Sequence, residues 1–305
     1  MSKVVIIGAG NVGSSAAYSM IQQRGIDELV LIDIAREKAE GEALDLAHCA
    51  AFTNNTRIRA TDDYAACAGA DVIVITAGAS RKPGQTRLDL IDINAKIIKS
   101  ITQSIIKHNP DPIIFMVSNP VDVLTYVCLK TSGLPRTRVL GTGTMIDMSR
   151  LSYAIANHFN LEPFKINTPV FGEHGDSQFP AWSLASGFPT TDMDLLDKIF
   201  EETKKGGAEV IKKKGATYYS IGMVIDTLTR AILTDANKAL PVSFLQEDAN
   251  GITDVCLSVP AFLGREGIVD IPLLTLISEE QQKLQKSATI LQQFLKNPEL
   301  PVDTL

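Results

Sequence analysis

The sequence predicts an α/β protein built on a doubly wound parallel sheet, followed by a second, mixed α/β domain. Short runs of apolar and β-branched residues alternate with longer amphipathic stretches over the first half of the chain. Continuous apolar runs are typical of parallel strands that helices cover on both faces. A glycine-rich turn follows the first of these runs directly. We expect the first domain to span residues 1–143 and the second to span residues 144–305.

The glycine-rich turn has the spacing of a phosphate-binding turn. The apolar run 4–7 leads into Gly8-Ala9-Gly10-Asn11-Val12-Gly13 and then into a stretch with helical character. Gly8 permits a tight turn, Gly10 lets a pyrophosphate approach the backbone, and Gly13 lets the helix lie close to the strand. The free N–H groups at the helix start can face the phosphates. This arrangement predicts that the domain binds a dinucleotide.

An acidic residue at the end of the second strand predicts which dinucleotide is bound. The apolar run 29–32 ends at Asp33, twenty residues after Gly13. A carboxylate at this place can accept hydrogen bonds from both ribose hydroxyls of an adenosine, and it would repel a 2′-phosphate. We therefore expect the cofactor to be NAD rather than NADP.

Further apolar strands are predicted over residues 71–76 and 113–117, with a helix between them. The loop 77–87 is too long and too rich in Gly and Pro for a plain connector, and such loops often act as lids. Ligands of open parallel sheets bind beyond the carboxyl ends of the strands, so these segments should share one crevice. The residues that we expect to contact the cofactor are Gly8, Gly10, Asn11, Val12, Gly13, Asp33, Thr76, Ala77, Gly78 and Asn119.

The second half of the chain is predicted to mix helices and strands. Its apolar periodicity indicates helices over residues 193–214 and 216–240, a strand over residues 166–171, two or three strands over residues 241–270, and a final helix. Residues 138–140 are expected to form the last strand of the first domain.

Composition narrows the classes of partner. Apolar residues make up 45% and charged residues 21% of the 305 residues, and the net charge is −6. A net negative chain is not expected to bind nucleic acid or an anionic membrane. No apolar run approaches the eighteen residues of a membrane span. The four cysteines have no CxxC spacing, so we expect neither disulfides nor a metal site, and a reducing cytoplasm fits them.

One histidine is the candidate acid/base group. Reduction of a 2-oxo acid with a nicotinamide requires a proton donor for the carbonyl oxygen, a guanidinium for the carboxylate, and exclusion of water. His174 follows a predicted strand and lies between Gly172 and Gly175, whereas the other three histidines lie in helical contexts. Histidine titrates near neutral pH, and a neighbouring carboxylate can fix its tautomer.

Several motifs resemble one family over essentially the whole chain. In chain order they are GAGNVG, Asp33, TAGASRKPGQTR, VSNPVD, GTGTMIDMSR, GEHGDS and KGATYY. Together they resemble the lactate and malate dehydrogenases. This resemblance implies a Rossmann domain that binds NAD, a mixed α/β substrate domain, and reversible hydride transfer between NADH and a small 2-oxo acid. It also implies a homo-oligomer, either a dimer or a tetramer.

The same resemblance implies roles for individual residues. His174 matches the acid/base group, and Asp147 matches the carboxylate that holds it. Arg87, at the end of the predicted lid, matches the arginine that stabilises charge on the carbonyl oxygen.

Three more positions match the family's substrate contacts. Arg150 matches the bidentate clamp on the substrate carboxylate, a role that suits the rigid fork of arginine. Asn119 matches the residue that hydrogen-bonds the substrate and the cofactor region. Thr217 matches the wall of the pocket near the substrate side chain.

Arg81, six residues before Arg87, conflicts with the rest of the motifs. In the family, malate enzymes carry an arginine at this place, which pairs with the second carboxylate of oxaloacetate, whereas lactate enzymes carry an uncharged residue. GEHGDSQFPAWS and KGATYYSIGM resemble the lactate branch. We expect an L-lactate dehydrogenase in which Arg81 adds oxaloacetate activity. The alternatives are an L-malate dehydrogenase and a broad dehydrogenase of the L-2-hydroxyisocaproate type. A binding module without catalysis is not expected, because the matched catalytic residues are all present.

Two further positions concern regulation. Lactate enzymes that fructose 1,6-bisphosphate activates resemble one another in an arginine and a histidine at the places of Ser152 and Asn167. Neither residue of this chain can offer a cation to a phosphate. We expect weak or absent activation by that sugar phosphate.

Overall fold

A computed structural model describes residues 2–53, 55–79, 87–249, 251–297 and 300–301, without the side chains of residues 87–89 and 249. Most of the predicted lid therefore lies outside the described residues, Arg81 included.

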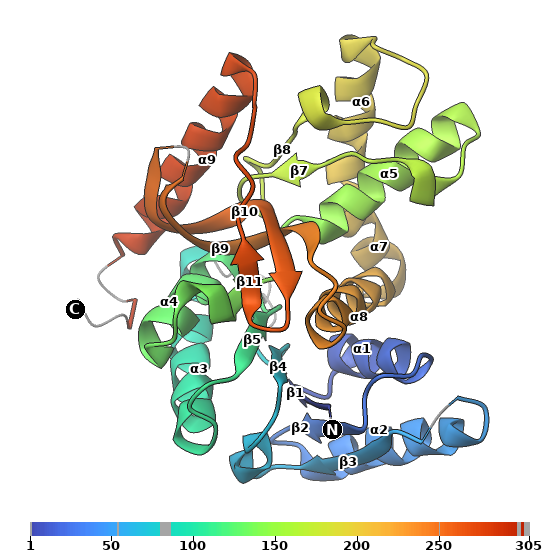
Figure 1. Cartoon of the computed structure of the whole chain (residues 1–305), viewed down its shortest axis with the longest axis vertical. Helices are drawn as coiled ribbons and strands as arrows, with labels where there is room; N and C mark the ends of the chain where they lie inside the picture. Colours follow the sequence, from blue (N-terminus) through green and yellow to red (C-terminus); the bar gives the residue numbers. More distant parts are fainter. Residues whose placement is uncertain (1, 54, 80–86, 250, 298–299, 302–305) are drawn as a thin grey trace.

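The described residues build one large mixed sheet, with the strand order β11-β10-β9-β6-β5-β4-β1-β2-β3 (Figure 1). Six strands run parallel: β1 (Lys3–Ile7), β2 (Glu28–Ile32), β3 (Arg57–Thr61), β4 (Val72–Ile75), β5 (Ile113–Met116) and β6 (Val139–Gly141). Three antiparallel strands extend it: β9 (Lys238–Ala249), β10 (Ile252–Gly264) and β11 (Gly267–Asp270). The predicted strand 138–140 is β6, the last parallel strand, and the sheet continues beyond it because Gly141 pairs with Ser243 of β9.

The register of the central strands brings their carboxyl ends to one level. Ile7 of β1 pairs with Ile32 of β2 on one side and with Ile75 of β4 on the other. Since parallel strands end at the same edge of a sheet, the segments that follow these three residues leave the sheet side by side. The site is built at this edge.

Nine helices are described, and most cover the two faces of the sheet (Figure 1). They are α1 (Asn11–Ile21), α2 (Arg36–His48), α3 (Arg87–His108), α4 (Val121–Ser132), α5 (Met145–Phe159), α6 (Met193–Lys204), α7 (Gly206–Lys214), α8 (Tyr219–Leu233) and α9 (Ser278–Leu295). α1 packs against α8, and this contact joins the first half of the chain to the second. None of the helices in the described ranges combines the length and the apolar character that crossing a bilayer demands.

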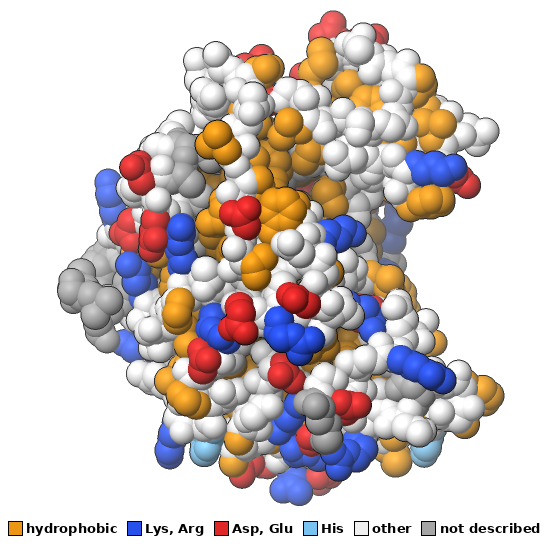
Figure 2. Space-filling model, in the orientation of Figure 1, with side chains coloured by type: hydrophobic (Ala, Val, Ile, Leu, Met, Phe, Trp, Pro, Cys, Tyr) orange, Lys and Arg blue, Asp and Glu red, His pale blue; other side chains and the backbone are white. Residues whose placement is uncertain are grey.

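The buried residues form one large core around the sheet and one small cluster. The central strands are fully buried, as their continuous apolar sequences predict. A second cluster lies between α5 and α6, where Leu151 and Ile155 pack with Leu196 and Phe200. The surface shown in Figure 2 mixes acidic and basic side chains.

The prediction of one helix over residues 193–214 was wrong. α6 ends at Lys204, and α7 begins at Gly206. Two adjacent glycines, Gly206 and Gly207, explain the break, because glycine has the second-lowest helix propensity after proline.

The prediction of a helix over residues 216–240 was wrong at both ends. α8 begins at Tyr219 and ends at Leu233, and β9 begins at Lys238. Asp235 and Asn237 adopt positive φ angles of 51° and 46°, which end a right-handed helix. The predicted strand 166–171 is also shorter: β7 comprises only Val170–Phe171, which pairs with Phe179–Pro180 (β8), while Asn167 forms an isolated bridge with Ser186.

Candidate active site

The glycine turn brings α1 into contact with the end of β1. Gly8 has a φ of 107°, and a Cβ at this residue would lie 2.7 Å from the backbone nitrogen of Ala77. A Cβ at Gly13 would collide with the carbonyl oxygen of Gly8. Thr76 donates a hydrogen bond from its hydroxyl to that same carbonyl oxygen at 2.8 Å. The turn is therefore tight because two glycines leave no side chain at the crossing.

Gly10 faces open space at the start of α1. A Cβ built on Gly10 would meet no atom of the described residues within 4 Å. Gly10 is also the N-cap of α1, which has no side-chain cap and no acidic residue in its first turn, formed by Asn11, Val12 and Gly13. An uncapped helix N-terminus attracts anions through its free N–H groups and its dipole. The turn thus fits the pyrophosphate of NAD.

Asp33 lies in a cavity of about 730 Å³ beyond the carboxyl ends of β1, β2 and β4. Its carboxylate accepts hydrogen bonds from the backbone N–H of Ala9 at 2.7 Å and from that of Ala35 at 2.9 Å. A carboxylate has about four acceptor positions, so two remain for ribose hydroxyls. The cavity is lined by Ile7, Gly8, Ile32, Asp33, Ile34, Asp62, Tyr64, Ala77, Gly78, Ala79, Lys96, Ile97, Ser100 and Ile101.

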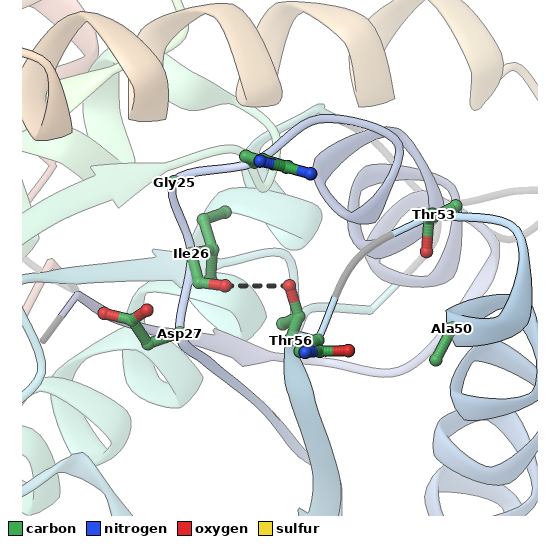
Figure 3. A pocket seen from close by; sticks show the side chains of 8 residues that line it. Gly25, Ile26, Asp27, Ala50, Thr53 and Thr56 are labelled. Atoms are coloured by element: carbon green, nitrogen blue, oxygen red, sulfur yellow. Dashed lines mark hydrogen bonds between the residues drawn. The ribbon is translucent and has the colours of Figure 1, made fainter.

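A second cavity, of about 470 Å³, lies at the opposite edge of the sheet (Figure 3). Its lining residues precede β2 and β3, and the hydroxyl of Thr56 donates to the carbonyl oxygen of Ile26 at 2.7 Å. Ligands of open parallel sheets bind at the other edge, and no histidine lines this cavity. It is not the candidate active site.

His174 and Asp147 form a close pair in the second half of the chain. Nδ1 of His174 lies 2.5 Å from Oδ2 of Asp147. Burial disfavours the imidazolium, but the charge and the hydrogen bond of the Asp147 carboxylate outweigh it and raise the pKa of His174 above its ordinary value. The pair is therefore arranged to hold and release a proton near neutral pH.

Arg150 shares the same carboxylate. Nη1 of Arg150 lies 3.3 Å from Oδ1 of Asp147, one helical turn away on α5. A Cβ at Gly207 would lie 3.3 Å from Nη2 of Arg150, so the bare glycine leaves room for the guanidinium. One nitrogen is engaged in the described structure, and the remaining donors of the fork can bind a carboxylate.

The start of α5 is held firmly against β7 and β10. The backbone N–H of Thr144 donates to the hydroxyl oxygen of Ser258 at 3.1 Å, and the hydroxyl of Thr144 donates to the carbonyl oxygen of Val170. Gly143 has a φ of 52°, and a Cβ there would collide with the Ser258 hydroxyl. These contacts determine where α5 presents Asp147.

The backbone of the His174 loop is held by β10, α9 and α4, through residues to which the motifs assign no role. Gly172 pairs with Ser258 of β10. The N–H of Glu173 donates to the hydroxyl oxygen of Ser287 on α9 at 2.7 Å. The N–H of His174 donates to Oδ2 of Asp122 on α4 at 2.8 Å. Asp122 and Glu173 lie inside the motifs VSNPVD and GEHGDS, which was the available signal.

Three other predicted site residues, Asn119, Thr217 and Arg87, have no described contact with the group formed by His174, Asp147 and Arg150. Asn119 ends the segment after β5, and its carbonyl oxygen accepts a hydrogen bond from Nδ2 of Asn94 at 2.8 Å. Asn119 does not line the cavity beside Asp33. Thr217 is half-buried between α7 and α8. Arg87 is the first residue of α3, and its side chain lies outside the description. The described residues contain no group of three His, Cys, Asp or Glu side chains that could hold a metal ion.

Both halves of the chain match known protein families. Residues 2–141 match the family described as lactate/malate dehydrogenase, NAD binding domain, and residues 144–299 match its alpha/beta C-terminal domain. The chain is 42% identical to L-lactate dehydrogenase 1 of Clostridium acetobutylicum, over 96% of this chain and 97% of that protein. It is 44% identical to an L-lactate dehydrogenase of Priestia megaterium, over 95% of each.

Two solved structures are also similar. One is MGS-M5, a lactate dehydrogenase from a Medee basin deep-sea metagenome library, with a TM-score of 0.92, 40% identity, and coverage of 96% of this chain and 98% of that chain. The other is the minor L-lactate dehydrogenase of Enterococcus mundtii, with a TM-score of 0.93, 38% identity, and coverage of 97% and 98%.

Proposed function

Since the chain belongs to the lactate/malate dehydrogenase family, we propose that it is an L-lactate dehydrogenase, in which Arg81 adds activity toward oxaloacetate. It is an NAD-dependent oxidoreductase, and its relatives at 42% to 44% identity bear the name L-lactate dehydrogenase. The observation that carries the proposal is the pairing of His174 and Arg150 with the two oxygens of one carboxylate, that of Asp147.

His174 is proposed as the acid/base residue. NADH, when bound, supplies the hydride that reduces the carbonyl carbon. Because Nδ1 of His174 faces Asp147, Nε2 is left to give a proton to the carbonyl oxygen of pyruvate during reduction. In the reverse direction the neutral imidazole takes the proton from the hydroxyl of L-lactate. Asp147 orients the ring in both directions and favours its protonated form.

Arg150 is proposed to bind the substrate carboxylate. Its guanidinium has donors beyond the one that faces Asp147, and a carboxylate matches their planar geometry. Arg87 is proposed to stabilise the charge that develops on the carbonyl oxygen. Asn119 and Thr217 are proposed to contact the substrate from the cofactor side and from the side-chain pocket.

The cofactor contacts are proposed from the edge of the sheet. The open space at Gly10 and the uncapped start of α1 support pyrophosphate binding there. The carboxylate of Asp33 supports recognition of the ribose hydroxyls of NAD. We place the boundary between the cofactor and substrate domains at residues 143 and 144, where Gly143 leads into α5.

Three further properties belong to this proposal. A homo-oligomer, a dimer or a tetramer, is expected from the family. A reducing cytoplasm is supported by four unpaired cysteines.

Weak or absent activation by fructose 1,6-bisphosphate is supported by Ser152, whose hydroxyl lies 2.8 Å from that of Thr168, and by Asn167, whose backbone pairs with Ser186. Millimolar sugar phosphate should leave the KM for pyruvate unchanged, and a severalfold decrease would contradict this.

The test of the substrate is kcat/KM for pyruvate and for oxaloacetate with NADH, at low and high salt, in the parent and in Arg81→Gln. In the parent we expect kcat/KM for pyruvate to equal or exceed that for oxaloacetate. In Arg81→Gln we expect kcat/KM for oxaloacetate to fall while that for pyruvate is kept. A hundredfold preference for oxaloacetate, roughly 2.7 kcal/mol of discrimination, would instead establish a malate dehydrogenase. Comparable activity with bulkier 2-oxo acids would favour the broad dehydrogenase.

A further inference from the structure

A second carboxyl group lies beneath the acid/base histidine. Asp122 is the second residue of α4, and its side chain is only 2% exposed. Oδ2 accepts the backbone N–H of His174 at 2.8 Å. An ionised carboxylate in the interior of a protein is costly unless it is paired or hydrogen-bonded. The groups that surround Asp122 therefore decide whether its carboxyl can carry a charge.

No lysine or arginine of the described ranges forms an ion pair with Asp122, so this carboxyl is not neutralised by a fixed cation. Its second oxygen, Oδ1, is buried, as is the hydroxyl of Ser243 on β9, and the two meet no well-aligned hydrogen-bond partner among the described residues. The Ser243 hydroxyl nevertheless interacts with the Asp122 carboxylate and lowers its pKa, which opposes the effect of burial. The cationic group that acts on Asp122 is His174 itself. Its position in the first turn of α4 also favours a negative charge, because the helix dipole is positive there.

The charged groups around His174 come from three elements. Asp147 and Arg150 face it from α5, with opposite effects on the imidazolium, and Asp122 faces it from α4. Glu173, in the same loop, is 1% exposed and opposes the ionisation of Asp122. Among these carboxylates, Asp122 is therefore the one that accepts the backbone N–H of His174. Its negative charge also acts on the His174 ring.

We propose that Asp122 is a positioning residue for His174: its carboxylate fixes the backbone of the acid/base residue and supplies a second negative charge that stabilises the imidazolium. This inference rests on the proposed function, in which His174 carries the proton. Burial raises the pKa of Asp122 to about 6, while the pKa of His174 is raised chiefly by Asp147, against burial, with Asp122 adding to it. Above a pH of about 6 Asp122 is negative, so it favours the protonated ring where reduction needs it.

The decisive variant is Asp122→Asn, which keeps an acceptor for the His174 N–H and removes the charge. The control is Asp254→Asn, which removes a carboxylate that pairs with Lys130 on the surface. The protein is labelled selectively at its four histidines. The His174 ring is titrated by NMR without cofactor, and kcat/KM for pyruvate is measured against pH.

In Asp122→Asn we expect the titration of the His174 ring to move to lower pH. The alkaline limb of pyruvate reduction should move the same way, with KM for pyruvate near that of the parent, because the Arg150 clamp is untouched. Asp254→Asn should leave both profiles in place. A merely structural role would lower kcat without moving either profile, and an unmoved ring titration in Asp122→Asn would overturn the proposal.

If Asp122→Asn does not fold, a measurement on the parent protein still tests the proposal. The backbone N–H of His174 donates to Asp122, so its chemical shift should report the protonation of that carboxyl, with an inflection near the pKa of about 6. A His174 amide signal without that inflection would also overturn the proposal. If the parent reduces neither 2-oxo acid, the proposed function fails, and the NMR titrations still decide the role of Asp122.

Discussion

The imidazole of His174 and the carboxylate of Asp147 meet at 2.5 Å, although the first lies in the loop after β7 and the second in the first turn of α5. The other oxygen of that carboxylate faces Arg150. One side chain thus orients both the proposed proton donor and the proposed carboxylate clamp. A change at Asp147 should therefore disturb proton transfer and substrate binding together.

Asp147→Asn should lower kcat by about 10²- to 10⁴-fold, the contribution typical of a positioned acid/base group. The amide cannot supply the negative charge, so burial dominates and the pKa of His174 falls. Reduction requires the protonated ring, and its alkaline limb should move to lower pH. The measurement is the pH profile of kcat for pyruvate reduction and lactate oxidation. Unchanged limbs would show that Asp147 does not control the ring.

Asp33→Ser should shift the cofactor preference toward NADPH. The carboxylate is held by the N–H groups of Ala9 and Ala35 in the wall of the cavity, where a 2′-phosphate would meet its charge. We expect the ratio of kcat/KM for NADPH to that for NADH to rise roughly ten- to a hundredfold, or about 1.4 to 2.7 kcal/mol. KM for pyruvate should stay near the parent value. An unchanged ratio would mean that Asp33 does not face the ribose.

Gly10→Ala and Gly13→Ala should separate cofactor binding from folding. A methyl group on Gly10 meets open space, so this variant should keep the thermal unfolding midpoint and lose affinity for NADH. A methyl group on Gly13 collides with the carbonyl of Gly8, so this variant should lose both stability and binding. The measurements are thermal unfolding without cofactor and NADH fluorescence titration. Normal NADH affinity in Gly10→Ala would contradict pyrophosphate binding at this turn.

Asn94→Ala should loosen the segment that carries Asn119. The buried Asn94 amide accepts the N–H of Ala79 at 2.7 Å and donates to the carbonyl oxygen of Asn119 at 2.8 Å. Its removal takes these hydrogen bonds from the half-buried Ala79 N–H and from the carbonyl oxygen of the exposed Asn119, at about 0.5 to 1.5 kcal/mol for each bond. We expect a lower free energy of unfolding and a higher KM for pyruvate. Asn94→Asp, which places an acceptor against the Asn119 carbonyl, should be at least as damaging.

The sequence by itself determined the first strand, the glycine turn and the position of Asp33, because each depends on residues that are close together in the chain. The run before Gly8, the spacing to Gly13 and the acid at Asp33 predicted a strand, a turn and a cavity edge, and the structure has all three. They were predictable because backbone freedom at glycine and burial of apolar strands act within a few residues. The ends of α6 and α8 were mispredicted, because apolar periodicity reports burial and does not report where the backbone turns.

The tertiary structure alone decided which distant groups touch. Asp122 and His174 are 52 residues apart, and Glu173 and Ser287 are 114 apart, yet each pair shares a hydrogen bond. No spacing in the sequence encodes these contacts, since they depend on how α4, α9 and β10 pack around one loop. By itself the sequence determined the chemical groups that are present and the strands that lead to them. Packing decided their distances, charges and burial, because the electrostatic effect of a carboxylate on an imidazole depends on separation and solvent exposure.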